Sequence, residues 1–131
     1  MDFLRSEFHW LRPTDLFADL CDCNCHVACA NVAFGSEIEH KVPPAGCETG
    51  GPRVATSKTE LMKYLRESFE YATRVMNTLT SQDALDPTDG PYAGKNTRVG
   101  VATLAIWHAS DHYGQLVVYL RMNGIVPPAS R

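Results

Sequence analysis

Two histidines near the end of the chain are spaced so that their side chains can bind one metal ion together. His108 and His112 are four residues apart in the segment WHASDHYGQL. On a helix, such side chains project from one face with Cβ atoms about 5–6 Å apart. Two imidazoles at that separation can share one divalent ion with Zn–N bonds of about 2.0–2.1 Å. Histidines near a core are also common as hydrogen-bonded residues, so the spacing alone leaves both interpretations open.

The residues around this pair offer further polar groups. Asp111 lies between the two histidines and could orient an imidazole by a hydrogen bond, or could be solvated. Tyr113 and Gln115 flank the pair and could contact an imidazole or a substrate. His9 and His40 have no second histidine at the spacing of a metal site, so we expect them at the surface.

Three segments carry the apolar period of a helix, over residues 14–34, 58–79 and 97–123. The first two repeat a 4-3-4-3-4 spacing, which is typical of helices packed against one another. The third stripe includes His108 and has Asp111 or His112 at its next position, so both histidines lie on or beside the face that points to the interior. In chain order the three stripes are Leu16, Leu20, Cys23, Val27, Ala30 and Phe34; Leu61, Leu65, Ser68, Ala72, Val75 and Leu79; and Val101, Leu104, His108, Asp111 or His112, Gln115, Tyr119 and Met122.

Local signals set the ends of these helices. Ser57 and Glu60 have the spacing of a capping box at the start of the second helix. Gly35 and Gly124 are expected to end the first and third helices. The connections 35–56 and 80–95 are longer than the two to eight residues usual in helical bundles, which predicts crossovers or loops that frame a site.

Composition excludes several classes of function. The 131 residues carry a formal net charge of −3, and the basic residues are scattered, so we expect no nucleic-acid partner. No apolar run approaches the roughly 20 residues of a membrane span, so we expect no membrane partner. The first ten residues lack the apolar core of a signal peptide, which favours a cytoplasmic protein.

Five cysteines stand at positions 21, 23, 25, 29 and 47. In a cytoplasmic protein we expect thiols rather than disulfides. Four of them fall on the first predicted helix, where thiols pack as small apolar groups, and a zinc finger is disfavoured because its thiolates usually come from turns. Cys47 falls in a Gly-rich connection and is expected to be accessible.

Residues 97–131 resemble the C-terminal helix and tail of DinB-like proteins. The resemblance rests on W-H-x-S-D-H-Y-G-Q-L followed by Y-L-R-M-N-G-I-V-P-P-A-S-R. The segments FADLCDCNCHVACANVAFG and TSKTELMKYLRESFEYATRVMNTLT are similar to the second and third helices of that family. The resemblance covers most of the chain after residue 14. It implies one all-α, up-down four-helix bundle domain over 1–131, with the first helix missing or reduced to a stub over 1–13.

The resemblance also implies a divalent metal held by three histidines, two from H-x-x-x-H and one from the second helix. His108 and His112 match the pair, whereas Asp19 stands where the third histidine is expected. Asp19 is our preferred third ligand. His26 is the alternative, since it faces almost the same direction but lies about 10.5 Å further along the helix axis. Zinc, nickel and iron are not distinguished by these ligands.

Some members of the family are thiol-dependent transferases or isomerases. The resemblance therefore implies a metal-dependent enzyme that acts on a small molecule, with a low-molecular-weight thiol as a further cofactor. The alternative is a non-catalytic, truncated bundle that serves as a structural or dimeric interaction module with a vestigial metal site. Because three helical stripes need a fourth surface to cover them, we also expect a homodimer.

Overall fold

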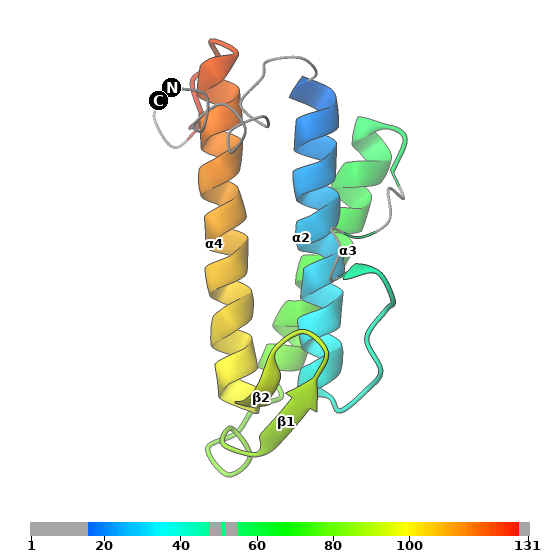
Figure 1. Cartoon of the computed structure of the whole chain (residues 1–131), viewed down its shortest axis with the longest axis vertical. Helices are drawn as coiled ribbons and strands as arrows, with labels where there is room; N and C mark the ends of the chain where they lie inside the picture. The colour runs from blue at the N-terminus through cyan, green and yellow to red at the C-terminus, as the bar shows by residue number, and fades with distance from the viewer. Residues whose placement is uncertain (1–15, 48–50, 52–54, 129–131) are drawn as a thin grey trace, which may run out of the picture.

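The computed structural model describes residues 16–47, 51 and 55–128, apart from the side chains of residues 16–19 and 21. Within these residues the chain forms three long helices and one β-hairpin (Figure 1). Its elements are α2 (Leu16–Ile38), α3 (Lys58–Met76), β1 (Pro87–Gly90), β2 (Gly94–Thr97) and α4 (Arg98–Met122). The mostly helical fold predicted from the sequence is confirmed, and the stub over 1–13 lies outside the described residues.

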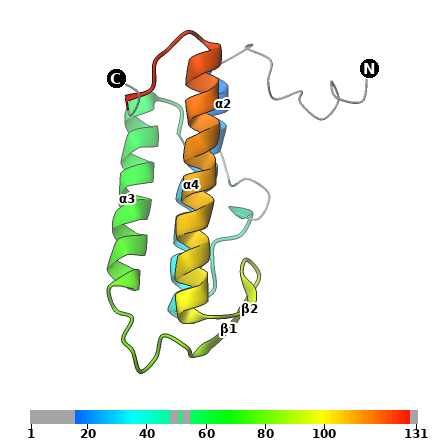
Figure 2. The same ribbon diagram turned by 90° about the vertical axis from the view of Figure 1, so that its left-hand side faces the viewer.

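Helices α2 and α3 run in the same direction, and α4 runs antiparallel to both (Figures 1 and 2). The connection after α2 returns along the length of that helix before α3 begins, so the first long connection is a crossover. Asn31 on α2 donates a hydrogen bond to Ser68 on α3 over 3.3 Å. Both α3 and α4 pack on α2 and make few contacts with each other. Helix α2 is therefore the centre of the molecule.

The sequence of α2 explains its central position. Most of its apolar residues are small, and they lie on all sides of the helix, which is the pattern of a helix that is buried all round. Five positions of the predicted stripe have described side chains: Leu20 is partly buried, and Cys23, Val27, Ala30 and Phe34 are buried. The opposite faces are buried too, because α3 and the crossover cover them.

Helix α2 does not end at Gly35, as the sequence suggested, but continues to Ile38. The chain leaves the helix at His40, which has a φ of 57°. The amide of His40 donates to the carbonyl of Glu37 over 3.1 Å, and the amide of Lys41 donates to that of Ser36 over 2.8 Å. These two bonds form a Schellman motif, in which histidine takes the left-handed position usually held by glycine.

The cysteines also differ from expectation. Cys29 and Cys47 form a disulfide that ties the crossover to α2, with their Cα atoms 5.3 Å apart. Cys47 is fully buried rather than accessible. Cys23 and Cys25 are buried and are not in a disulfide, as expected for packed thiols. The prediction that all the cysteines are thiols is therefore wrong for one pair, because the Gly-rich connection folds back against α2.

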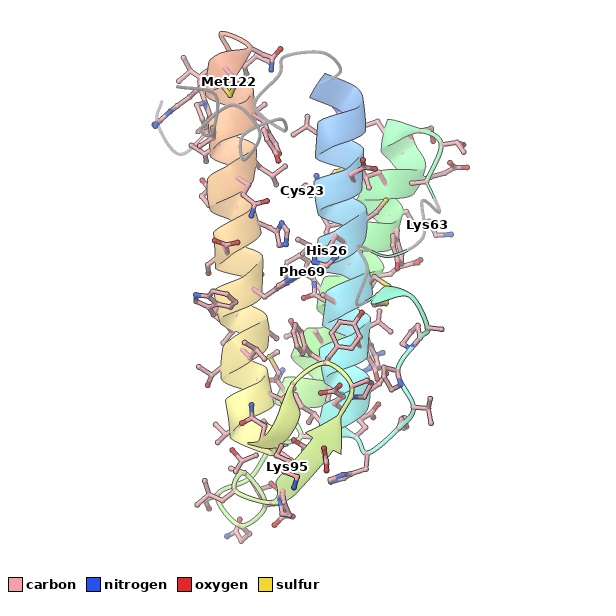
Figure 3. All side chains as sticks on the ribbon, viewed as in Figure 1. Cys23, His26, Lys63, Phe69, Lys95 and Met122 are labelled. Atoms are coloured by element: carbon pink, nitrogen blue, oxygen red, sulfur yellow. A yellow bond between two sulfur atoms is a disulfide. The ribbon has the colours of Figure 1, made fainter. Side chains whose placement is uncertain are left out.

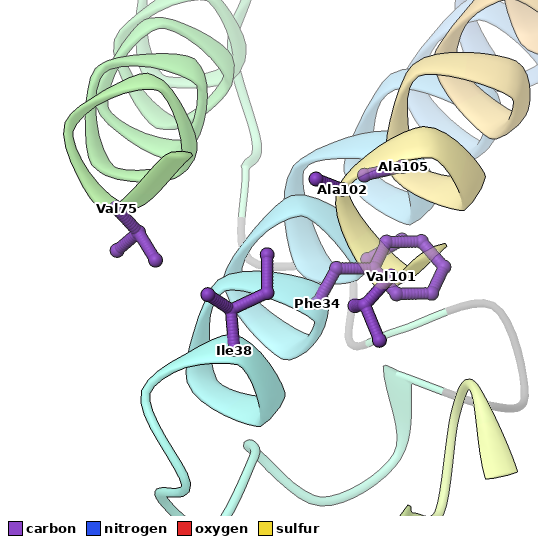
Figure 4. Packing of buried hydrophobic residues seen from close by; sticks show 7 residues of the cluster. Phe34, Ile38, Val75, Val101, Ala102 and Ala105 are labelled. Atoms are coloured by element: carbon purple, nitrogen blue, oxygen red, sulfur yellow. The ribbon is translucent and has the colours of Figure 1, made fainter. Parts of the chain in front are cut away.

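The main core lies at the hairpin end of the molecule (Figure 4). Here the last turns of α2 and α3 meet the first turns of α4. The buried residues of this core are Ala30, Phe34, Ile38, Val75, Val101, Ala102 and Ala105. The hairpin closes that end, and the buried carboxylate of Glu37 accepts hydrogen bonds from the amides of Tyr92 and Ala93 over 2.6 and 3.0 Å. The core thus fixes α2 and α4 relative to each other below the histidines.

Helices α3 and α4 begin and end within a few residues of the positions predicted from the sequence. Ser57 caps α3 by accepting from the amide of Glu60 over 3.3 Å. The Glu60 carboxylate accepts from the amide of Thr56, one residue before the position expected of a capping box. Gly124 follows α4 with a φ of 71°, as predicted for a stop. No helix in the described part of the chain has both the length and the apolar character needed to cross a membrane.

Candidate metal centre

Three histidines from two helices meet halfway along the molecule. His26 comes from α2, and His108 and His112 come from α4. One ligand nitrogen from each lies within 4.8 Å of the others. The Nε2 atoms of His26 and His108 are 3.1 Å apart, and the three ring centroids are separated by 4.6–4.9 Å. Figure 3 shows His26 in the space between α2 and α4.

Helix geometry brings these side chains together. The two histidines of α4 project from one face because they are four residues apart. The antiparallel packing of α2 and α4 sets which residue of α2 faces them. The ring of Phe34 lies against His108 with centroids 5.7 Å apart, so the main core forms one wall of the site. All three histidines are partly buried, which leaves the site in reach of solvent.

The surroundings keep the imidazoles of α4 neutral. Burial, together with the charges of His112 and His26, lowers the pKa of His108 from 6.5 to about 4, and the charge of Asp111 opposes this shift. Burial also lowers the pKa of His112, whereas Asp111 and Gln115 act in the opposite direction. A neutral imidazole has one nitrogen lone pair free, and this is the form that binds metals.

The distances fit a shared ion. Two imidazoles that bind one ion at about 2.0–2.1 Å hold their nitrogens about 2.9 Å apart at a right angle and about 3.3 Å apart at the tetrahedral angle. The 3.1 Å between the Nε2 atoms of His26 and His108 lies within that range. Nδ1 of His108 is buried and has no hydrogen-bond partner among the described residues. The polar contact of this ring is therefore made by its Nε2 atom, which faces His26.

A thiol stands beside the three imidazoles. Sγ of Cys23 lies 3.2 Å from Nδ1 of His112 and 3.8 Å from the carbonyl oxygen of the same residue. Burial, together with the negative charge of Asp111, raises the pKa of Cys23 to about 12. The group is therefore a neutral thiol at pH 7. Figure 3 shows Cys23 one turn above His26 on α2.

The structure unites His108 and His112 with His26, which the sequence left as the alternative third ligand. Asp19 belongs to α2, but its side chain lies outside the described residues. The register between the helices shows why His26 is the residue that reaches the pair. Cys23 lies level with His112, so the backbone of α2 at Asp19 stands about one turn beyond Cys23 on the side away from His108.

The other predicted residues lie around the site rather than in it. Asp111 is exposed and accepts a hydrogen bond from Nε2 of Gln115 over 3.0 Å. Gln115 is partly buried and also contacts His112. Tyr113 is 53% exposed and makes no hydrogen bond or ring contact with the histidines. His40 is exposed, as expected, and His9 lies outside the described residues.

Comparison with known proteins agrees with the fold. The family model described as DinB superfamily matches residues 9–116. This span includes α2, α3, the hairpin and the part of α4 that carries both histidines. No curated protein and no solved structure matches the chain closely enough to count as a relative. With most of its length matched by the family model, the chain belongs to the DinB superfamily.

Proposed function

We propose that the protein binds one divalent metal ion through His26, His108 and His112. The observation that carries this proposal is the convergence of three ligand nitrogens, from two helices, within 4.8 Å of one another. Imidazole ligands suit zinc, nickel and iron alike, so the ligand set does not choose among these ions. The neutral form favoured by burial supports the proposal, because a protonated imidazole cannot bind a cation.

We further propose that the ion serves a reaction on a small molecule. A divalent ion with three protein ligands keeps a position for water, a thiolate or a substrate, and lowers the pKa of the bound group. In this proposal the three histidines hold the ion, and the ring of Phe34 excludes solvent on one side of it. Gln115 contacts one of the ligands from outside the site. The reaction class is a transferase or isomerase that uses a low-molecular-weight thiol, as the family resemblance implies.

Metal analysis of protein made without a histidine tag tests the binding site. We expect close to one ion per chain, and a marked loss in His26→Ala, His108→Ala and His112→Ala. His40→Asn is the matched control, because His40 is exposed and its positive φ suits asparagine. Asp19→Ala should leave the metal content unchanged. If Asp19→Ala lost the metal while His26→Ala kept it, the third ligand would be Asp19 rather than His26.

The alternative proposal is a non-catalytic bundle whose site is vestigial. The observation in its favour is the 3.1 Å separation of the Nε2 atoms of His26 and His108, which a hydrogen bond between two neutral imidazoles would also give. Titration of the Co²⁺-loaded protein with azide and with 2-mercaptoethanol separates the two proposals. A spectral change shows an exchangeable position and supports the enzyme, whereas an unchanged spectrum or the absence of any bound Co²⁺ supports the non-catalytic bundle.

A further inference from the structure

The thiol of Cys23 makes two contacts with a single residue of the opposite helix. Its Sγ lies 3.2 Å from the imidazole Nδ1 of His112 and 3.8 Å from the backbone carbonyl oxygen of His112. Both contacts join residues 89 positions apart in the sequence, so they are products of the fold rather than of helix geometry. Cys23 is 7% exposed and therefore makes these contacts away from bulk water.

In only one arrangement of the protons are both contacts hydrogen bonds. A thiol has one proton to donate and a sulfur that accepts weakly. The backbone carbonyl of His112 can only accept, so the S–H proton is directed to it. Sγ then accepts from the imidazole, and Nδ1 of His112 carries the proton of that bond, whereas an S–H proton donated to Nδ1 would leave the carbonyl contact without a hydrogen bond.

We propose that Cys23 is a positioning residue that holds His112 in the tautomer with its proton on Nδ1, leaving the lone pair of Nε2 for the metal. In a neutral imidazole only one nitrogen carries a proton, so a hydrogen bond from Nδ1 frees Nε2. Metal-binding histidines usually donate their other N–H to a carbonyl or a carboxylate. Here a thiol takes that role, and its bond to the carbonyl keeps it in place.

This inference rests on the proposed metal site but makes a separate claim about the metal-free protein. In ¹⁵N-labelled protein without metal, the imidazole shifts of His112 should show the Nδ1–H tautomer. Cys23→Ala should shift the ring toward a mixture of both tautomers. A His112 ring that carries its proton on Nε2 in the unsubstituted protein would overturn the inference, whether or not the protein binds metal.

Metal affinity gives the second readout. Replacing a residue that orients a metal ligand typically weakens binding 10- to 100-fold. We expect Zn²⁺ to bind Cys23→Ala about 10-fold more weakly than the unsubstituted protein, with partial recovery in Cys23→Ser, whose hydroxyl can also donate and accept. Cys25→Ala is the matched control, since Cys25 is also buried on the same helix but packs against Ala55 and Leu61.

The outcomes separate three cases. Weak binding in Cys23→Ala, recovery in Cys23→Ser and full binding in Cys25→Ala support the positioning role. Equal affinity in all four proteins would overturn it while leaving the three-histidine site intact. A sulfur-to-metal charge-transfer band in the Co²⁺-loaded protein that vanishes in Cys23→Ala would also overturn it, because Sγ would then bind the ion itself. A failure of the unsubstituted protein to bind any metal would contradict the proposed function. The tautomer measurement on the metal-free protein would still test the inference about Cys23.

Discussion

Gly35 of α2 lies directly against the ring of Tyr71 on α3. A Cβ atom at Gly35 would stand 2.6 Å from Cε1 of Tyr71, closer than real Cβ contacts allow. The hydroxyl of Tyr71 donates a hydrogen bond to Glu39 over 2.7 Å, which holds the ring in this place. The glycine that resembles a helix stop in the sequence is therefore a contact point between two parallel helices.

The first prediction compares the same substitution at two helical glycines. Gly35→Ala should lower the free energy of unfolding by about 1 kcal/mol, since overpacking costs about 1–3 kcal/mol and exceeds the gain in helix propensity of about 1 kcal/mol. Gly114→Ala is the control, because a Cβ at Gly114 meets nothing within 4 Å. That change should raise the free energy of unfolding by up to about 1 kcal/mol. Urea denaturation measures both, and a gain in stability for Gly35→Ala would contradict the contact.

The second prediction concerns the disulfide between Cys29 and Cys47. It closes a loop with a sequence separation of 18, for which chain entropy predicts a stabilisation of about 3 kcal/mol. The double variant Cys29→Ala with Cys47→Ala should lose roughly that amount in urea denaturation. Cys25→Ala controls for the loss of a buried sulfur. Alkylation of the unfolded, unreduced protein should label three of the five cysteines, and five labelled cysteines would show that the disulfide does not form.

The third prediction is the pH dependence of the metal-free protein. The pKa of His108 is lowered in the folded state, so the unfolded chain binds a proton there more readily. This contribution to stability is complete above pH 6.5 and is lost as the pH falls toward 4. The midpoint of urea denaturation should therefore fall over that range in the presence of EDTA. His108→Gln should flatten the fall, whereas His40→Asn should not. An unchanged slope in His108→Gln would mean that other groups cause the acid sensitivity.

The sequence was enough to predict the helices and two residues of the site. The stripes of α2, α3 and α4 depend on local periodicity, and the four-residue spacing of His108 and His112 is a local property too. The third histidine depends on the register between α2 and α4, which is set by the core near Phe34 and Val101. No local sequence pattern indicates that register, so the sequence could not decide whether Asp19 or His26 is the third ligand.

The hairpin and the disulfide were missed for related reasons. Strands β1 and β2 are short and polar, without the alternation of apolar residues that indicates a strand. The hairpin loop is tied to the molecule by Glu37 of α2, a contact more than fifty residues away in sequence. The partner of Cys29 likewise depends on how the crossover folds back. These features come from tertiary contacts, which a single sequence does not display.

The last prediction concerns self-association, which we propose on the basis of the outer face of α4. Large apolar side chains on this helix remain exposed in the described part of the chain, with Ile106 at 63% and Trp107 at 62%. Between Arg98 and Arg121, near its two ends, α4 carries a single charged residue, Asp111. Burying about 300 Å² of apolar surface is worth about 7 kcal/mol, which is comparable with the whole stability of a domain. A second copy of the chain is the occupant that we propose.

Sedimentation at micromolar concentration tests this proposal. The unsubstituted protein should be a dimer, and Ile106→Glu should make it a monomer because a carboxylate buried at an apolar interface is costly. Val42→Glu is the control, since Val42 is 94% exposed in the crossover, away from α4. A compact monomer that dimerises only after removal of residues 1–13 would contradict the proposal and would show that Phe3, Phe8 and Trp10 belong to the segment that covers α4. A monomer in both forms would mean that this apolar face needs no cover in water.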